Sequence, residues 1–379
     1  MASVEAVLAP SRVVRRPRRV ALVGAMVAGV ATQYQNVAAA ARVDPQFDVV
    51  GVPVSPYAAD AFERWLRVLP ASVRGSIRSI AATAPLFSRS GFDLVWTQID
   101  LPLLPWMLTA NAHAQAPVIY TADSTPALLR SFGSLYGDWG GRWRIKSWAR
   151  DRLHSAVLKR AAAVNAWSEW AARSMRDDYG VPAERVTVLP PGVDTEFWSP
   201  PQQRLPSVRP RILFVGGDFV RKGGDLLVDV WRTRLRHLAD LDIVTARGKA
   251  SDVAGANLHT GVEPNSARLL ALYQQADVLA IPTRADCFSM AGLEGLACGL
   301  PVVTCPVGGV AELFSDQEQG FFVKVDDGRA LAGTLQQLLT SAPLRQQVSA
   351  RARRLAVQRY DARRNAERLL SLIHEQDAP

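Results

Sequence analysis

Short apolar runs alternate with longer helical segments along the whole chain, and this alternation restricts the fold more than any other feature. The apolar runs predict strands at residues 20–23, 47–52, 94–97, 117–120, 163–166, 186–189, 212–215, 242–245, 278–281, 301–304 and 320–323. Helices are predicted at residues 34–43, 62–80, 103–112, 143–160, 169–179, 225–238, 266–275, 290–298, 328–339 and 343–360. Strands joined by helical crossovers form parallel sheets that helices cover on both faces. The pattern therefore predicts the α/β class with doubly wound sheets.

The chain has 379 residues, which is long for one hydrophobic core. Proline and glycine are densest at residues 190–210, as is typical of a link between two domains. The predicted organisation is a flexible basic tail (1–18), a Rossmann-like domain (19–195), a linker (196–210), a second Rossmann-like domain (211–360) and a C-terminal helix (361–379). An arginine-rich helical pattern runs from residue 344 to 375, so we expect its last part to pack back on the first domain.

The net charge is +9 and the sequence pI is near 9.9, with most of the excess in the first half. Such an excess fits nucleic acid, an anionic membrane or phosphorylated ligands without choosing among them. The only cysteines are Cys287, Cys298 and Cys305, and their spacing matches no metal motif. Their small, odd number suits a reducing compartment. We therefore expect no metal site and a cytoplasmic location.

Four arginines at residues 15–19 precede an apolar run that ends at Ala31, an arrangement that looks like a secretion signal. The run is far shorter than the ~20 residues that a membrane-spanning helix needs. It also contains Gly24 and Gly29. We therefore predict that it forms the first strand of the first domain, with the two glycines in the turn that leads to the following helix.

A glycine-rich loop at residues 216–224 follows a predicted strand and precedes a predicted helix. Glycine lets the backbone approach a ligand closely, and a helix N-terminus attracts phosphate. Arg221 and Lys222 in this loop could add charge-assisted contacts. The loop is neither a P-loop nor a G-x-G-x-x-G motif. Most loop arginines and lysines are merely solvated, so a phosphate site and a solvated loop are both open.

Residues 276–303 combine an apolar strand, a polar loop and a short helix that ends at Gly299. Asp286 lies in the loop and Glu294 about one turn into the helix, near the carboxyl end of a parallel strand, where open α/β sheets bind ligands. Glu294 could accept two ribose hydroxyls, as an acid does in dinucleotide sites, or be a solvated helix glutamate. Asp286 could bind a sugar hydroxyl or cap its loop.

Asp123 follows the predicted strand at residues 117–120 and is expected to face the space between the two domains. It could orient an acceptor hydroxyl or cap the helix that begins near Pro126. Residues 62–87 and 140–160 are basic and contain tryptophan. Such helices can lie on anionic membranes, although a solvated helix face is the commoner explanation. Nucleic acid is disfavoured, because no recognisable binding module accompanies the charge.

Four ordered segments give the sequence a family resemblance: residues 168–181, 188–194, 214–224 and 276–303. Together they resemble the retaining nucleotide-sugar glycosyltransferases of the GT-B architecture, in particular family 4. The resemblance extends from about residue 163 to 360, and more loosely back to residue 20. It implies two Rossmann-like domains facing across a cleft, with the donor on the second and the acceptor on the first. It also implies that no metal or cofactor is needed, because basic side chains and helix dipoles neutralise the leaving diphosphate.

The resemblance assigns the donor contacts to particular residues. Lys222 matches the diphosphate-binding lysine, and Glu294 matches the ribose-binding glutamate. Asp286 falls on the first acid of the family's E-x7-E motif, where glutamate is usual. The backbone that would hold the donor sugar belongs to Phe288, Ser289 and Met290.

Other positions depart from the family pattern. Gly217 stands where arginine is common, so Arg221 is expected to substitute for it. Asp123 is the polar residue offered where many members have a histidine. Gly24 and Gly29 lack the accompanying histidine pattern of some relatives and are expected only to shape the acceptor-side turn.

The resemblance therefore implies an enzyme that moves a hexose from a nucleoside diphosphate sugar to an acceptor hydroxyl with retention of anomeric configuration. Asp123, Lys222 and Asp286 are the residues expected nearest the reaction, and Lys222→Ala is expected to stop transfer while leaving the fold intact. Glycan, lipid-linked and small-molecule acceptors all fit, and peripheral contact with an anionic membrane is left open. Two alternatives also stay open: a non-catalytic nucleotide- or membrane-binding protein of the same architecture, and a sugar-nucleotide epimerase.

Overall fold

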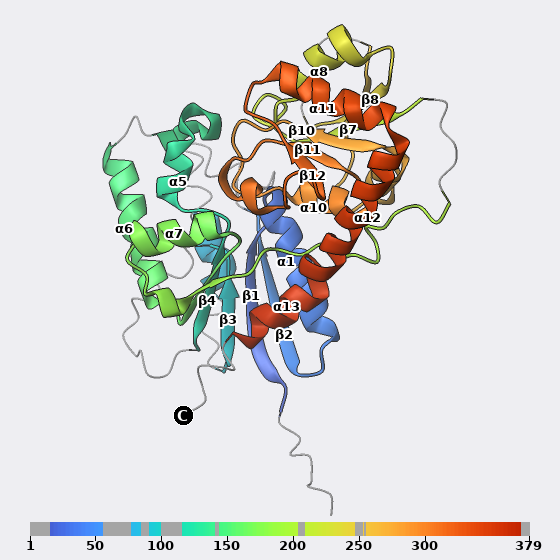
Figure 1. Cartoon of the computed structure of the whole chain (residues 1–379). Coiled ribbons are helices and arrows are strands. Elements are labelled where there is room, and N and C mark those ends of the chain that lie inside the picture. The colour runs from blue at the N-terminus through green and yellow to red at the C-terminus, as the bar shows by residue number, and fades with distance from the viewer. Residues whose placement is uncertain are drawn as a thin grey trace, which may run out of the picture.

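The structure, a computed structural model, describes residues 16–55, 77–84, 91–99, 116–140, 144–203, 209–246, 253 and 255–372. It contains two six-stranded parallel sheets, one from each half of the chain, with helices interleaved between the strands (Figure 1). The predicted α/β class with two Rossmann-like domains is therefore confirmed. The predicted helices at 62–80 and 103–112 lie mostly or wholly outside the described residues, as does most of the predicted basic tail.

The first sheet has the strand order β2-β1-β3-β4-β5-β6. Its strands are β1 (Arg18–Ala25), β2 (Phe47–Val54), β3 (Leu94–Thr97), β4 (Val118–Ala122), β5 (Ala163–Ala166) and β6 (Val186–Val188). The helical elements described in this half are α1 (Ala28–Val43), α5 (Pro126–Ser131), η1 (Gly133–Gly140), α6 (Arg144–Arg160), α7 (Glu169–Asp177) and η2 (Ala183–Arg185). Every residue of β3 and β5 is buried, as expected for central strands covered on both faces.

The second sheet has the order β12-β11-β10-β7-β8-β9. Its strands are β7 (Arg211–Val215), β8 (Asp240–Val244), β9 (Asn257–His259), β10 (Val278–Ile281), β11 (Val302–Thr304) and β12 (Gly320–Phe322). Its helical elements are α8 (Gly224–Val230), the π-helical η3 (Trp231–Leu235), α9 (Ala267–Gln275), α10 (Met290–Ala297), η5 (Gly308–Glu312), α11 (Gly328–Thr340) and α12 (Ala342–Arg359). The strand order reverses between β7 and β10, and such a switch point is where open α/β sheets bind ligands.

Two details of the predicted elements are wrong. The prediction omits β9, because this short edge strand is partly exposed and carries little apolar signal. It also places Gly24 and Gly29 in the turn after the first strand, whereas Gly24 belongs to β1 and Gly29 belongs to α1, which begins at Ala28. Glycine is normally unfavourable inside a helix, so a packing contact described below explains its position better than local propensity does.

The arginine-rich C-terminal pattern forms two helices rather than one. α12 ends before Tyr360, and α13 (Ala362–Ser371) begins after Asp361, whose carboxylate accepts a hydrogen bond from the Arg364 N–H. α13 lies against α1 on the first domain (Figure 1). Its apolar side chains Ala366, Leu369 and Leu370 join the core around β1 and β3.

The chain crosses between the domains twice, and the two crossings are hydrogen bonded to each other. The Val193 N–H donates to the Tyr360 carbonyl at 2.8 Å, and the Ala362 N–H donates to the Val193 carbonyl at 2.9 Å. A Cβ on Gly192 would lie 2.4 Å from the Ala362 Cα, so the close approach requires glycine. The outgoing crossing at Val193 and the returning crossing therefore form one two-stranded joint.

In the part of the chain that the structure describes, no helix combines the length and the apolar character needed to cross a membrane.

Candidate active site

The loops that follow β7 and β10 pack directly on each other at the switch point. The Arg284 N–H donates to the Arg221 carbonyl at 2.9 Å, and the Thr283 hydroxyl lies 3.4 Å from the same oxygen. Gly223 has a φ of 78°, and a Cβ there would lie 2.1 Å from the Pro282 carbonyl oxygen. Glycine is therefore required where the two loops meet.

We expect Gly223→Ala to destabilise the second domain by at least about 2 kcal/mol, because the left-handed conformation and the clash with Pro282 both penalise a side chain. Gly333→Ala is the matched control: a Cβ there meets nothing within 4 Å, and its position inside α11 favours alanine by up to about 1 kcal/mol. Denaturant unfolding of both variants checks this. Equal stability of Gly223→Ala and wild type would contradict it.

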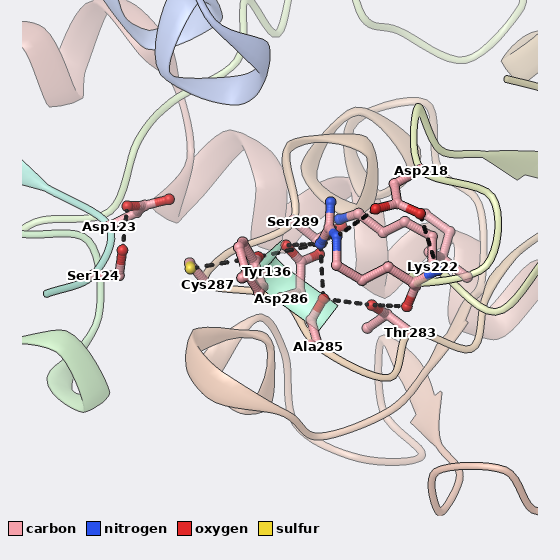
Figure 2. Close-up of polar contacts among 12 residues, drawn as sticks. Asp123, Ser124, Tyr136, Asp218, Lys222, Thr283, Ala285, Asp286, Cys287 and Ser289 are labelled. Carbon is pink, nitrogen blue, oxygen red and sulfur yellow. Dashed lines mark hydrogen bonds and ion pairs between the residues drawn. The ribbon is translucent and has the colours of Figure 1, made fainter. Parts of the chain in front are cut away.

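A buried cluster of charges joins the two loops. The Lys222 ammonium donates to Asp286 Oδ2, and Arg221 Nη1 lies 3.9 Å from Asp286 Oδ1 (Figure 2). The side chains of Lys222 and Asp286 are only 14% and 6% exposed. The contacts described for the Asp286 carboxylate are thus with cations of the neighbouring loop, rather than with N–H groups of its own loop. The alternative that Asp286 simply caps its own loop therefore does not describe these contacts.

The positive charge at this position comes mainly from side chains. The N–H groups of residues 222–224 already donate to carbonyl oxygens of residues 218–220. Asp225, at the start of α8, binds Arg284 through both carboxylate oxygens, at 2.7 and 3.0 Å. Gly217 is exposed and borders open space, so a ligand could approach the loop there.

Arg221 is held by partners from both domains. Its Nε donates to Asp218 at 3.2 Å, and its Nη1 donates to the Ala285 carbonyl at 2.8 Å. Nη1 also donates to the hydroxyl of Tyr136, a residue of η1 in the first domain, at 3.1 Å. Burial, with further contributions from Cys287 and Asp286, raises the pKa of Tyr136, so this hydroxyl stays neutral. No sequence motif or periodicity identifies Tyr136.

Glu294 is buried in α10, with only 6% of the residue exposed. Its Oε2 accepts a hydrogen bond from the Tyr273 hydroxyl at 2.8 Å. Burial raises the pKa of Glu294 from 4.5 to about 7, and the Tyr273 hydrogen bond opposes this rise. The alternative of a solvated helix glutamate is therefore wrong. Tyr273 lies in α9 and was not identified from the sequence.

Asp123 lies at the carboxyl end of β4, on the first-domain side of the site (Figure 2). Thr125, not Asp123, caps α5 by accepting a hydrogen bond from the Leu128 N–H, so the capping alternative is wrong. The Ser124 hydroxyl donates to Asp123 at 2.9 Å. Burial raises the pKa of Asp123, and the nearby Asp286 carboxylate adds to the rise.

A cavity of about 140 Å³ adjoins Asp123 in the first domain. Its lining includes Gln98 from the end of β3, Ser124, and Trp167 from the end of β5. The Gln98 amide nitrogen donates to Gln33 at 2.6 Å, and its buried Oε1 has no partner among the described residues. The cavity therefore offers a carboxyl group and a free acceptor to a polar ligand.

The predicted sugar-holding segment, Phe288 to Met290, lies where the domains touch. Ser289 caps α10 by accepting from the Gly292 N–H at 3.2 Å. The Phe288 ring packs edge-on against Trp167 of the first domain, with centroids 6.0 Å apart. A Cβ on Gly29 would lie 2.7 Å from the Met290 Cγ, which explains a glycine inside α1.

Gly24 has a packing role of its own within the first domain. A Cβ there would lie 2.1 Å from the Tyr34 ring. Gly24 is the seventh residue of β1, so its predicted place in the turn is wrong, and the glycine instead lets α1 lie close to the end of this strand.

The basic helix α6 presents Trp148 with 61% of its surface exposed, and the Arg152 guanidinium lies 5.4 Å from the Trp148 ring centroid. An exposed tryptophan with an arginine beside its ring fits both a solvated helix face and a membrane-binding face, so membrane contact stays a prediction. Among the described residues, no group of three or more His, Cys, Asp or Glu side chains is placed to hold a metal ion.

Comparison with known proteins covers both halves of the chain. The family model described as Glycosyltransferase Family 4 matches residues 27–197, and the model described as Glycosyl transferases group 1 matches residues 209–341. A D-inositol 3-phosphate glycosyltransferase of Xylanimonas cellulosilytica is 32% identical over 205 residues, 46% of this chain and 48% of the relative. One from Geodermatophilus obscurus is 30% identical over 277 residues, 65% and 59% of the two chains. The chain spans about half the length of the curated relatives it matches.

Solved structures share the fold along nearly the whole chain. Sucrose-phosphate synthase from Thermosynechococcus elongatus has a TM-score of 0.73 at 17% identity, covering 95% of this chain and 99% of the other. Anabaena HepE in complex with UDP-glucose has a TM-score of 0.68 at 16% identity, covering 94% and 99%. Such identities show the fold alone. With both family matches in chain order over two parallel sheets, the chain belongs to the family 4, group 1 glycosyltransferases of the GT-B architecture.

Proposed function

We propose that this protein is a glycosyltransferase that moves a hexose from a nucleoside diphosphate sugar to an acceptor hydroxyl, with retention of anomeric configuration. The observation that carries the proposal is the cluster of Arg221, Lys222 and Asp286 at the β7–β10 switch point, with Glu294 buried in the helix that follows β10. Names of the relatives support it: several are D-inositol 3-phosphate glycosyltransferases, and HepE was solved with UDP-glucose.

Each donor group would meet a side chain of matching chemistry. Lys222 and Arg221 would stabilise the charge that develops on the leaving diphosphate, where preorganised cations lower the barrier most. The Glu294 carboxylate would accept the ribose hydroxyls. When the donor diphosphate binds the Lys222 ammonium, the Asp286 carboxylate would turn away from Lys222 and toward the sugar. The proposal assigns the neutralisation of charge to these side chains and calls for neither a metal nor a cofactor.

The acceptor would enter from the first domain. The cavity beside Asp123 presents a carboxyl group and the Gln98 oxygen, which has no partner among the described residues, and both can accept a hydrogen bond from a hydroxyl. The acceptor proton would pass to the leaving phosphate, so no separate base is assigned. Contact between the domains would exclude water and limit hydrolysis of the donor.

The test is thermal melting of the whole protein with UDP, GDP, ADP, their sugar conjugates and NAD. A ligand at a hundredfold excess over its dissociation constant adds about 2.7 kcal/mol, and we expect a melting shift of a few degrees with one nucleoside diphosphate and its sugar conjugate. The donor so identified is then offered acceptors, and the anomeric configuration of the product is read by NMR. A shift with NAD alone, or inversion in the product, would contradict the proposal.

One observation favours a second candidate, a non-catalytic nucleotide-binding protein. The Lys222 ammonium is already paired with Asp286, where the family usually has a longer glutamate, so the cation is less available than in an open site. Tight nucleotide binding without turnover of any donor would select this candidate. Turnover with any acceptor would exclude it.

A further inference from the structure

The first domain reaches the β7–α8 loop through three aromatic rings that lie next to one another in series. Trp170, in the first turn of α7, lies 5.6 Å from Phe132, and Phe132 lies 5.4 Å from Tyr136, measured between ring centroids. The Arg221 Cζ lies 4.7 Å from the Tyr136 ring centroid. These three rings, here called the aromatic series, therefore end on a cation of the second domain.

The direction of the Arg221 side chain depends on both domains. Asp218 and Ala285 hold it from its own domain, at 3.2 and 2.8 Å. Of the partners that the described residues give it, only Tyr136 lies in the first domain, and that residue contributes a ring face as well as a hydroxyl. The Tyr136 hydroxyl also accepts from the Cys287 thiol at 3.5 Å, next to Asp286. Tyr136 therefore fixes Arg221 on the side of the loop nearest Asp286.

The far end of the aromatic series is fixed by the second domain. The Glu312 carboxylate, at the end of η5, accepts hydrogen bonds from the N–H groups of Glu169 and Trp170, both at 2.8 Å. A carboxylate at a helix N-terminus is favoured by the helix dipole. The second domain thus anchors α7, and α7 in turn supports the rings that reach back to Arg221.

We propose that Tyr136 is a positioning residue for the donor diphosphate, holding the Arg221 guanidinium toward the phosphate nearest the sugar while the two domains are in contact. The inference rests on the proposed function, which places the sugar beside Asp286. Because Arg221 is fully held only when the first domain touches it, diphosphate binding and domain contact must stabilise each other. The residue acts through Arg221 and need not touch the substrate itself.

The test measures binding of UDP and UMP to the whole protein by calorimetry, with GDP and ADP as replacements if melting selects another base. Tyr136→Leu is expected to weaken UDP binding about tenfold, as loss of a desolvated cation–π contact would. UMP lacks the second phosphate, so its affinity is expected to change less than twofold. Tyr136→Phe keeps the ring and loses the hydroxyl, and is expected to give an intermediate loss. In turnover, the KM for the donor should rise while that for the acceptor stays constant.

A double-mutant cycle separates positioning from a general structural role. In an Arg221→Ala background, Tyr136→Leu is expected to change UDP affinity less than twofold, because the residue through which it acts is gone. Tyr179→Phe is the matched control: it removes a tyrosine hydroxyl in the same domain that binds Asp151, away from the loop, and should leave UDP affinity unchanged.

The outcomes distinguish the inference from the function on which it rests. If wild type binds a nucleoside diphosphate and Tyr136→Leu binds it equally well, or loses affinity equally in both backgrounds, the inference is overturned and the proposed function stands. If wild type binds none of UDP, GDP and ADP, both are overturned.

Discussion

Replacing Lys222 with alanine is expected to lower the rate of sugar transfer about 10²- to 10³-fold, the usual effect of removing one preorganised donor from a developing oxyanion. Lys222 is the cation bound to Asp286 at the switch point, with its side chain only 14% exposed, so water cannot fully replace it. Initial rates at saturating donor measure the effect. The loss should appear in turnover more than in donor affinity, because the leaving group gains its charge in the transition state.

The same substitution is also expected to lower the stability of the fold, which differs from the sequence expectation of an unaffected structure. It leaves the Asp286 carboxylate buried without its partner, and breaking a buried pair in this way typically costs about 3–5 kcal/mol. Adding Asp286→Asn should restore most of the stability without restoring transfer, and Asp286→Asn alone supplies the reference for losing the carboxylate. If the Lys222→Ala, Asp286→Asn double variant transfers sugar as fast as Asp286→Asn alone, Lys222 has no role in the mechanism.

Glu294→Gln is expected to make the protein more stable at pH 8 and a poorer nucleotide binder. Burial raises the pKa of Glu294 from 4.5 to about 7, so the folded state disfavours its charged form. Stability from this group is fully present below pH 4.5 and is lost as the pH rises through about 7. At about 1.4 kcal/mol per pKa unit, ionisation of the buried Glu294 carboxylate lowers the free energy of unfolding by on the order of 3 kcal/mol at pH values above about 7.

Glutamine keeps an oxygen for the Tyr273 hydroxyl but carries no charge, so the variant should escape this cost. Denaturant unfolding from pH 5 to pH 8 should show the advantage of the variant growing with pH. Nucleoside diphosphate affinity at pH 8 should fall about tenfold or more, as when a hydrogen bond to a charged group is lost. A variant whose stability relative to wild type is independent of pH would contradict the burial argument. An unchanged affinity for the nucleoside diphosphate would show that Glu294 does not bind the ribose.

The parts of this molecule that sequence predicts are those encoded by local pattern. β5 and β10 are central strands with every residue buried, so their apolar runs mark them with little ambiguity. Lys222 and Asp286 follow neighbouring strands of one sheet, and the switch-point topology alone brings them together.

The parts that sequence does not predict depend on contacts between distant segments. Tyr136 and Arg221 are 85 residues apart in the sequence, and Glu312 is about 140 residues from the start of α7. Local sequence periodicity carries no information about pairs so far apart. Gly29 illustrates the same limit within an element. Its position inside α1 is explained by the close approach of Met290 from the other domain, which leaves no room for a Cβ, and not by the local preference of glycine for a turn.

The paired crossings at Val193 and Tyr360 join the two halves of this protein at two places rather than one. A protease cut at residues 201–203 would not release the donor half, because α12 and α13 still carry the chain back to the first sheet. Ending the chain at Tyr360 would instead strip Ala366, Leu369 and Leu370 from the core beside β1. A chimera that joins this donor half to a new acceptor half therefore needs two junctions, one in each crossing. It also needs a returning helix that packs on the new acceptor half.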